Sequence, residues 1–399
     1  MKSGLAVETL NGEKSRAHAG VLTLTLFSLG HFFIDLYSGS LGVMQPYLIN
    51  KFGLSLTQAG MIGGLLVFSS SVTQPLFGYL SDRHRSRYYS ALGPAVAGVF
   101  ILGASLTPGY YWAVAAMLIG GVGVSAFHPQ ASSWAVLGMK RDRAKWMAVF
   151  ISAGTLGIAL APAFFNEVIT RAGFEHLVWA ALPGVAVTIL LVALVREPEE
   201  EAATVSRAFD WPALHCVWRP LFILYMGVFF RSAIQITYSH FLILYLNRER
   251  GFSISAAAYT LTLYLTAGAV GGLLGGHLSD RFSARRLILA SFALSFPFMA
   301  LFFLTSSALG VVSLVFGGAI LLFTIPVNVV VAQRLVPSQA ATVSALLMGF
   351  AWGTAGMIFI PLTGWLADRT SLHAALSALL VFPVLGWAMA RHLPEDLGQ

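Results

Sequence analysis

Charged residues are scarce in this sequence: 10% of its 399 residues are Asp, Glu, Lys or Arg, whereas 57% are hydrophobic. Soluble domains carry about 25% charged residues, so these side chains are too few to cover an aqueous surface. Apolar runs of about 20 residues, the length of a helix that crosses a bilayer, recur along the chain. They indicate a polytopic helical membrane protein, since a membrane β-barrel would show short alternating segments instead.

Cysteine is nearly absent, because Cys216 is the only one. A single cysteine excludes a disulfide framework, a Cys-based zinc site and an iron–sulfur cluster within the chain. The nucleotide-binding fingerprint G-x-x-x-x-G-K-[ST] and the hydrolase motifs H-E-x-x-H and G-x-S-x-G are also missing. We therefore expect a protein driven by an ion gradient, with no cofactor and no resident metal. A membrane-embedded enzyme is the less favoured alternative.

Twelve apolar spans are predicted, and the longest polar connection separates the sixth from the seventh. This connection, 196–217, is expected to be a cytoplasmic linker between an N-terminal six-helix bundle, 1–195, and a C-terminal one, 218–399. The spans are expected at about 21–46, 56–80, 88–107, 110–137, 145–168, 173–195, 218–246, 255–278, 286–306, 309–333, 340–366 and 371–391.

The positive charge alternates from loop to loop. Of the 24 Lys and Arg residues, 18 lie at the termini or in loops after even-numbered spans, and 5 lie in loops after odd-numbered spans. Loops rich in Lys and Arg stay in the cytoplasm. We therefore expect a multi-pass protein of the cell inner (plasma) membrane with both termini in the cytoplasm. The net charge of +7 is then a signal of orientation, and we expect contact with the lipid bilayer, no nucleic acid and a monomer.

The two halves of the chain resemble each other. "GYLSDRHRSR" at 78–87 matches "GHLSDRFSARR" at 276–286, and "GTLGIALAP" at 154–162 matches "GTAGMIFIP" at 353–361. The two matches lie at nearly the same offset and in corresponding spans. We predict an all-α fold of 12 transmembrane helices in two pseudo-symmetric six-helix bundles. Repeats of this kind place a substrate site near the bilayer midplane, between the halves.

Twelve spans, a central cytoplasmic loop and the motif G-x-L-S-D-R-x-x-x-R after span two resemble the major facilitator superfamily over essentially the whole chain. Within it, "GHFFIDLYSGSLGVMQPYL" at 30–48, "FHPQAS" at 127–132 and "FRSAIQ" at 230–235 resemble the fosmidomycin-resistance-protein family of efflux carriers. The resemblance implies proton-coupled efflux, by alternating access, of a small anionic or amphipathic compound such as a phosphonate-type antibiotic. "GTLGIALAP" resembles the span-five motif of proton antiporters but lacks their usual Gly-Pro pair.

Span one contains His31 and Asp35, which are four residues apart and share one helix face. Ionisable residues at this depth almost always face the bundle interior or a wet cavity, with a partner. Arg231 lies near the middle of span seven, the counterpart of span one. We expect Asp35 and Arg231 to pair, either directly or through substrate; a static structural ion pair is the alternative.

Arg231 offers a planar fork suited to phosphonate, phosphate or carboxylate. Asp35 can change its protonation state, because burial favours the neutral form and a nearby Arg favours the charged form. Antiport needs proton and compound to displace one another, whereas symport needs proton uptake on Asp35 to release Arg231 for the anion. The residues permit both, so proton-coupled uptake of a carboxylate or phosphate ester is the alternative function.

His128 precedes Pro129 in span four, whereas Ile325 precedes the corresponding Pro326 in span ten. The imidazole is thus added to a proline that both halves share, which favours a role in substrate or proton binding; a hydrogen bond to a neighbouring helix is the alternative. Gln235, one turn from Arg231, is predicted to orient Arg231 or the ligand. Metal transport by the two histidines and Asp35 is disfavoured, because Arg231 close by would repel a cation.

Gating residues are expected in both repeated motifs. The loop carboxylates and their Arg neighbours can form a latch at a helix N-terminus in one conformational state. The glycine–proline segments are expected to bend as the halves rock, with close packing as the alternative. The predicted gating residues are Asp82, Arg83, Asp280, Arg281, Gly154, Pro162, Gly353 and Pro361.

Overall fold

The computed structural model describes residues 2–84, 86–137, 143–195, 211–279 and 281–395, apart from the side chains of 2–19 and of a few residues elsewhere. Over these residues the chain is helical and contains no strand. Twelve stretches are long and apolar enough to cross a membrane, which confirms the predicted number. Their bounds lie within a few residues of the predicted spans.

The first six spans are built from the following helices: α1 (Lys2–Ser38) with α2 (Leu41–Phe52); α3 (Leu56–Val67), η1 (Phe68–Val72) and α4 (Gln74–His84); α5 (Tyr88–Ala91), α6 (Gly93–Gly103) and η2 (Ala104–Leu106); α7 (Tyr110–Trp134); α8 (Arg143–Ala172); and η3 (Phe174–Ala181) with α9 (Leu182–Leu194).

After the short α10 (Trp211–Cys216), the other six spans comprise α11 (Trp218–Arg250); α12 (Ile254–Leu278); α13 (Ala284–Leu304); α14 (Ala308–Leu322) with α15 (Ile325–Leu335); η5 (Pro337–Gln339), α16 (Ala340–Ala345), η6 (Leu346–Phe350) and α17 (Ala351–Arg369); and α18 (Leu372–Ala378) with α19 (Val381–Ala390).

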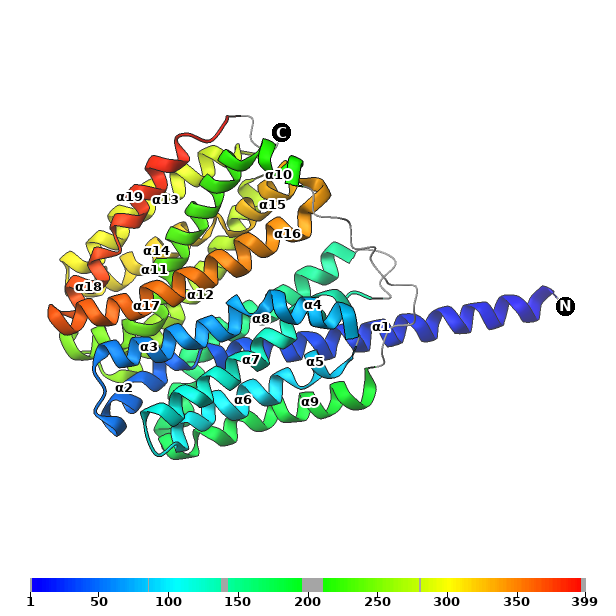
Figure 1. Ribbon diagram of the computed structural model, residues 1–399, viewed down its shortest axis with the longest axis horizontal. Helices are drawn as coiled ribbons and strands as arrows, with labels where there is room; N and C mark the ends of the chain where they lie inside the picture. The colour runs from blue at the N-terminus through cyan, green and yellow to red at the C-terminus, as the bar shows by residue number, and fades with distance from the viewer. Residues whose placement is uncertain (1, 85, 138–142, 196–210, 280, 396–399) are drawn as a thin grey trace.

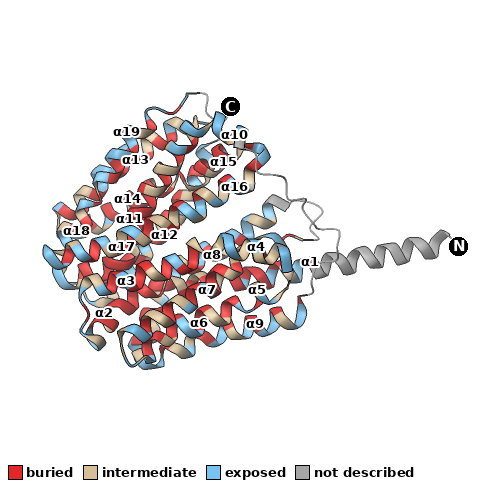
Figure 2. Ribbon diagram, in the orientation of Figure 1, coloured by how far each residue is buried: buried red, intermediate tan, exposed pale blue. Residues whose placement is uncertain are grey.

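The spans form two bundles of six, which confirms the predicted fold class (Figure 1). The bundles meet where α3 packs along α17, and they diverge toward the end from which the N-terminal part of α1 extends. Buried residues fill each bundle and the contact between them (Figure 2). The linker residues 196–210 lie outside the described residues, so the domain boundaries stay a prediction.

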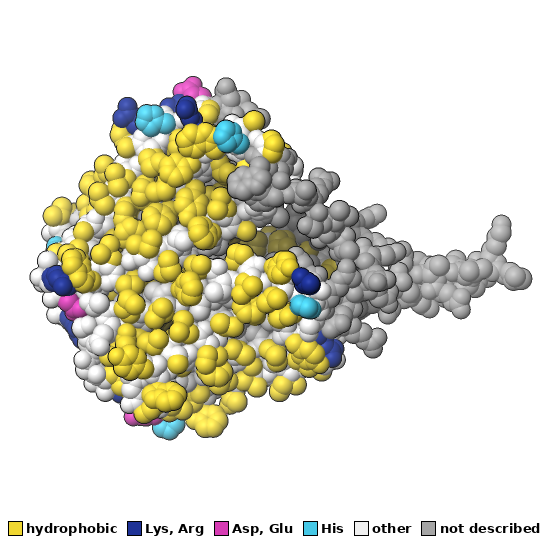
Figure 3. All heavy atoms as spheres, viewed as in Figure 1, with side chains coloured by type: hydrophobic (Ala, Val, Ile, Leu, Met, Phe, Trp, Pro, Cys, Tyr) yellow, Lys and Arg dark blue, Asp and Glu magenta, His cyan; other side chains and the backbone are white. Residues whose placement is uncertain are grey.

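Apolar side chains cover the middle of the face seen in Figure 3, and most charged ones lie toward the helix ends. Large hydrophobic residues such as Leu273 and Leu304 are among the most exposed side chains. A soluble protein rarely exposes so continuous an apolar area, whereas a bilayer solvates it. The two bundles therefore present an apolar surface of the kind expected of helices that cross a bilayer.

The contact between α3 and α17 depends on glycines. A Cβ atom at Gly60 would lie 2.8 Å from the carbonyl oxygen of Ile360, and one at Gly64 would lie 2.7 Å from Cγ of Pro361. Gly364 approaches the carbonyl oxygen of Leu56 even more closely. Side chains at these positions would force the helices apart. The two backbones are therefore almost in direct contact at this end of the interface between the bundles.

Beyond this contact, both helices pass into a π-helical turn, η1 on one side and η6 on the other. Gly353 lies next to η1, since a Cβ atom there would be 2.9 Å from Cβ of Ser71. π turns are frequent at functional sites and leave a helix locally less regular. Helix α7, in contrast, continues through Pro129, whereas span ten breaks just before Pro326.

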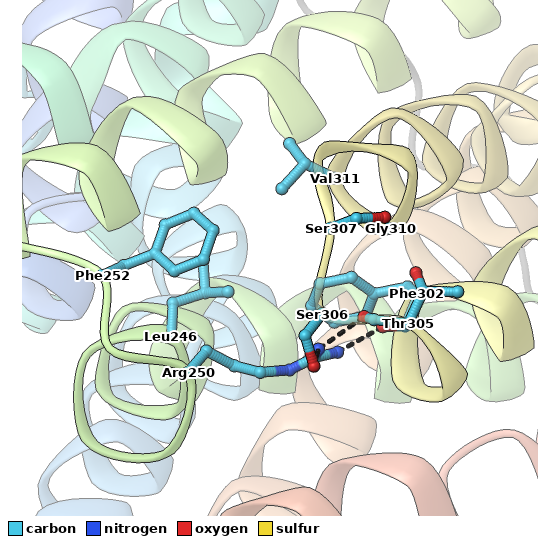
Figure 4. A pocket seen from close by; sticks show the side chains of 9 residues that line it. All are labelled: Leu246, Arg250, Phe252, Phe302, Thr305, Ser306, Ser307, Gly310 and Val311. Atoms are coloured by element: carbon cyan, nitrogen blue, oxygen red, sulfur yellow. Dashed lines mark hydrogen bonds between the residues drawn. The ribbon is translucent and has the colours of Figure 1, made fainter.

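Arg250 fastens the end of α11 to the end of α13 (Figure 4). Its guanidinium donates to the carbonyl oxygens of Phe302 and Thr305 and to the hydroxyl of Ser306, and its Nε donates to the Tyr245 hydroxyl at 2.7 Å. A helix C-terminus leaves carbonyls without partners, and a cation there binds them favourably. The small cavity in Figure 4 thus lies within a structural contact between the ends of α11 and α13.

Replacing Arg250 with Met is expected to destabilise the protein, because the half-buried carbonyls lose their donor at about 1–3 kcal/mol. Thermal unfolding of the detergent-solubilised protein checks this, with Arg248→Met as the matched control, since Arg248 is exposed and two residues away. Equal unfolding temperatures for the two variants would contradict the assignment.

Candidate functional site

His31, Asp35 and His128 come together inside the N-terminal bundle. The first two lie one turn apart on α1, and His128 lies on α7. Nε2 of His31 is 3.4 Å from Oδ2 of Asp35, and Nε2 of His128 is 3.4 Å from Oδ1 of the same carboxylate. Each imidazole therefore faces its own carboxylate oxygen, and we call these three residues the His–Asp–His cluster.

Backbone carbonyls hold the far side of both rings. Nδ1 of His31 donates to the carbonyl oxygen of Phe150, and Nδ1 of His128 donates to that of Val124, both at 2.8 Å. A carbonyl oxygen only accepts, so the proton of each neutral ring is on Nδ1 and its Nε2 presents a lone pair. Two lone pairs and a carboxylate then converge, an arrangement that a proton or another cation stabilises.

The cluster lies at the edge of an accessible space. The side chain of Asp35 is 17% exposed and that of His128 is 23% exposed. The ring of His31 is more deeply buried and stacks on Phe150, with 4.3 Å between ring centroids. One histidine is thus fixed by packing, while the carboxylate and the other histidine can be reached from outside the bundle interior.

Gly154 on α8 lies directly against this cluster. A Cβ atom there would be 2.3 Å from Nε2 of His31 and 2.6 Å from Oδ2 of Asp35. Any side chain at this position would displace the cluster, so the glycine is required by close approach. Helix α8 runs without a break from Arg143 to Ala172, through Gly154 and the buried Pro162; bending at these residues stays a prediction.

Arg231 lies in the other bundle, on α11, and is 4% exposed. Its Nε and Nη1 are buried and have no hydrogen-bond partner, and no carboxylate of a described residue pairs with it within 4.0 Å. The direct Asp35–Arg231 ion pair, one of the two predicted forms, is therefore not formed here. Asp35 is instead bounded by two histidines, and pairing through a bound compound stays a prediction.

Further buried polar groups on the C-terminal side also lack partners. Two of them are Oε1 of Gln235, one turn from Arg231, and the hydroxyl of Tyr264 on α12. A buried polar group without a partner costs about 1–3 kcal/mol, and such groups are typical of sites that a ligand or water completes. Sequence analysis included Gln235 but missed Tyr264, which nothing in its surrounding sequence distinguishes.

A second missed residue is Asp368, at the end of α17. Its Oδ1 accepts from the backbone N–H of Leu56 at 2.9 Å, and its Oδ2 accepts from the N–H and hydroxyl of Thr57 at 2.8 and 2.5 Å. These amides begin α3, where the helix dipole favours a negative charge. Asp368 thus joins the two bundles at the end where α3 and α17 are in contact.

Three more hydrogen bonds cross between the bundles, from α12 to the end of α8. The hydroxyl of Tyr259 donates to Glu167, that of Ser255 donates to Asn166 at 3.1 Å, and that of Thr262 accepts from the N–H of Ala163 at 3.0 Å. Together with Asp368 and the glycine contacts, they close this end of the molecule.

The predicted latch at the opposite end is not resolved by the described residues. Asp280 lies outside them, and the side chain of Asp82 is not described. Arg83 and Arg281 are exposed, and Nη1 of Arg83 donates to the hydroxyl of Tyr79 at 2.9 Å. A gating role for these four residues stays a prediction.

Comparisons with known proteins agree with this architecture. The Uncharacterized MFS-type transporter YfnC of Bacillus subtilis (strain 168) is 27% identical over 383 residues, covering 94% of this chain and 93% of the relative. The Fosmidomycin resistance protein of Escherichia coli (strain K12) is 27% identical over 399 residues, covering 96% and 95%.

Solved structures show the same fold. The crystal structure of a bacterial homolog to the human lysosomal transporter Spinster, inward-facing and unoccupied, has a TM-score of 0.77 at 18% identity, covering 94% of this chain and 96% of that one. The D-xylose-proton symporter has a TM-score of 0.74 at 16% identity, covering 95% and 99%.

The sequence profile of the Major Facilitator Superfamily matches residues 27–358 and 221–396. These matches span most of the chain, and the family is one of transporters of small molecules and not of enzymes. The chain therefore belongs to the Major Facilitator Superfamily, as a multi-pass membrane transporter.

Proposed function

We propose that this transporter exchanges protons for a small anionic or amphipathic compound, such as a phosphonate-type drug, and exports the compound by alternating access. One observation carries the proposal: Arg231, a buried guanidinium with no carboxylate partner among the described residues, lies on the span that corresponds to the one bearing His31 and Asp35. Each bundle thus contributes one charged site, an anion site and a proton site.

The anion site consists of Arg231 with Gln235 and Tyr264. A guanidinium binds a phosphonate or carboxylate through two parallel hydrogen bonds, and here Nη1, one donor of the terminal pair, has no partner, nor has Nε. A compound that fills these donors relieves the cost of leaving them buried and unpaired. Binding is therefore favoured for anions with two oxygens on one atom.

The proton site is the His–Asp–His cluster. With both rings neutral, two Nε2 lone pairs face an ionised carboxylate, so the cluster has a strong tendency to take up a proton. Ionisable residues in membrane spans commonly serve as proton relays in transporters. The exposed fractions of Asp35 and His128 give a proton a route to the cluster.

Export is supported by the likeness to the Fosmidomycin resistance protein and by the shape of the molecule. The end at α3 and α17 is closed by Asp368 and the glycine contacts, whereas the molecule is hollowed between the bundles toward the opposite end (Figure 3). Arg83 and Arg281 lie at that open end, and under the positive-inside rule this end would face the cytoplasm. This is the side from which an exporter takes up its compound.

Proton-coupled uptake of an organic anion is the second candidate, and one observation favours it. Because no ion pair joins Asp35 to Arg231, a proton on the cluster adds positive charge without having to release Arg231. Proton and anion would then favour each other's binding, as symport requires.

Proteoliposomes with a pH-sensitive dye inside test both candidates. When fosmidomycin is added outside under an imposed proton gradient, antiport moves protons in the direction opposite to the compound, and symport moves them in the same direction. Compound flux without any proton movement would contradict proton coupling.

Asp368→Asn is expected to weaken the closed end, because the carboxylate loses its charge and one acceptor at the start of α3. The loss of about 1–3 kcal/mol corresponds to a shift of about 5- to 150-fold in the equilibrium between the conformation with this end closed and the one with it open. Spin labels on cysteines introduced at the exposed Tyr111 and Leu304, in a Cys216→Ser background, report the distance between the bundles at this end.

A larger population at long distance is the expected result for Asp368→Asn. Glu175→Gln, which changes an exposed carboxylate, is the control and should leave the distances unchanged. Identical distance distributions for the two variants would contradict a role of Asp368 in keeping this end closed.

A further inference from the structure

We propose that the His–Asp–His cluster is a binding site for a divalent transition metal ion, with Zn²⁺ as the probe, and that the bound ion blocks transport. The binding stands on the geometry of three side chains, and only its effect on transport rests on the proposed function. The ligand atoms of His31, Asp35 and His128 all lie within 4.8 Å of one another.

The separations within the cluster fit an ion better than a direct hydrogen bond. A hydrogen bond between a charged imidazole and a carboxylate is about 2.7–2.9 Å long, whereas both Nε2–Oδ distances here are 3.4 Å. Ligand atoms held about 2.0–2.1 Å from a tetrahedral ion lie about 3.3–3.4 Å from each other. The two imidazole–carboxylate separations thus match those between neighbouring ligands of one ion, and the ligand atoms of all three residues lie within 4.8 Å of one another.

The far sides of the two rings support the same assignment. Histidines that bind metals almost always donate their other N–H to a carbonyl or carboxylate, which fixes the ring and points a lone pair at the ion. Phe150 and Val124 supply these carbonyls. Two imidazoles and one carboxylate suit Zn²⁺ and its first-row neighbours, whereas Mg²⁺ and Ca²⁺ prefer oxygen ligands.

Gly154 leaves the space that an ion needs. The position that a Cβ atom would take lies 2.3 Å from Nε2 of His31 and 2.6 Å from Oδ2 of Asp35, so the missing side chain keeps this side of the cluster free of carbon atoms. Three protein ligands leave a fourth position open, and the exposure of Asp35 and His128 lets water or an anion reach it. No nitrogen of Arg231 lies within 4.0 Å of the Asp35 oxygens, so its charge lies outside the ligand shell of such an ion.

Calorimetric titration of the purified protein with ZnCl₂, after removal of any histidine tag and in a Cys216→Ser background, tests the binding without a proton gradient. We expect one site, weakened at least about 100-fold in His31→Gln and His128→Gln. Gly154→Ala is expected to weaken it about 10- to 100-fold, the range of changes beside the ligands. The visible absorption of bound Co²⁺, compared between the parent and the two histidine variants, gives a second readout.

His240→Gln is the matched control, because His240 is also buried and its Nδ1 also donates to a carbonyl of its own helix, that of Ile236 at 2.8 Å. This variant should bind Zn²⁺ like the parent. No Zn²⁺ binding by the folded parent, or binding equal in parent, His31→Gln and His128→Gln, would overturn the proposal. Zn²⁺ binding at this site in a protein that moves no fosmidomycin would support the metal site and contradict the proposed function alone.

Discussion

Replacing Asp35 with Asn is expected to abolish proton-coupled transport. The carboxylate is the group that both Nε2 atoms face, and an amide neither ionises nor holds a proton between two imidazoles. Removing one charged partner from a buried site costs about 2–5 kcal/mol, which is a loss of about 30- to several-thousand-fold in the coupled rate. Proton movement driven by fosmidomycin in proteoliposomes measures it.

The same variant should still bind fosmidomycin in the absence of a gradient, because Arg231 is unchanged. Retained binding without coupled flux separates loss of the proton site from misfolding. Glu175→Gln serves as the control for removing a carboxylate. If Asp35→Asn and Glu175→Gln supported equal coupled flux, the proton would have to bind elsewhere.

Replacing Arg231 with Gln is expected to act in opposite directions on binding and on stability. The bound anion loses a bidentate charged donor, so its affinity should fall by about 30- to several-thousand-fold. The protein without ligand loses a buried charge that has no carboxylate partner among the described residues, so its unfolding temperature should rise. Sites that bind charged ligands are often kept at a cost in stability.

Binding measured by fluorescence or calorimetry and thermal unfolding of the same preparation check both effects. Arg231→Lys should bind the anion with intermediate affinity, because it keeps the charge but not the planar fork. A lower unfolding temperature for Arg231→Gln would instead indicate a static structural role, the alternative considered for this residue.

Much of the fold could be predicted because it depends on local patterns. Apolar runs of membrane length located the twelve spans, and the repeated loop motif identified the two halves. The shared face of His31 and Asp35 also follows from their spacing on one helix. These inferences needed only neighbouring residues and helix geometry.

The contacts between distant spans could not be predicted in the same way. His128 was a candidate because of its place before Pro129, but its approach to Asp35 depends on how α7 packs beside α1. Gly154 suggested a bend, whereas the structure places it against the cluster. Asp368 is separated from Thr57 by 311 residues, and a lone acidic residue at the end of a span carries no local sign of the helix that it caps.

The glycine contact between α3 and α17 also determines what the molecule exposes when that end opens. Gly60 and Gly364 rest on the carbonyl oxygens of Ile360 and Leu56, with no side chain between the two backbones. If the two helices separated, the peptide groups exposed at these contacts could be hydrated by water, whereas apolar side chains could not. The opened end would thus present main chain at these contacts, beside the polar side chains of Asp368 and Thr57.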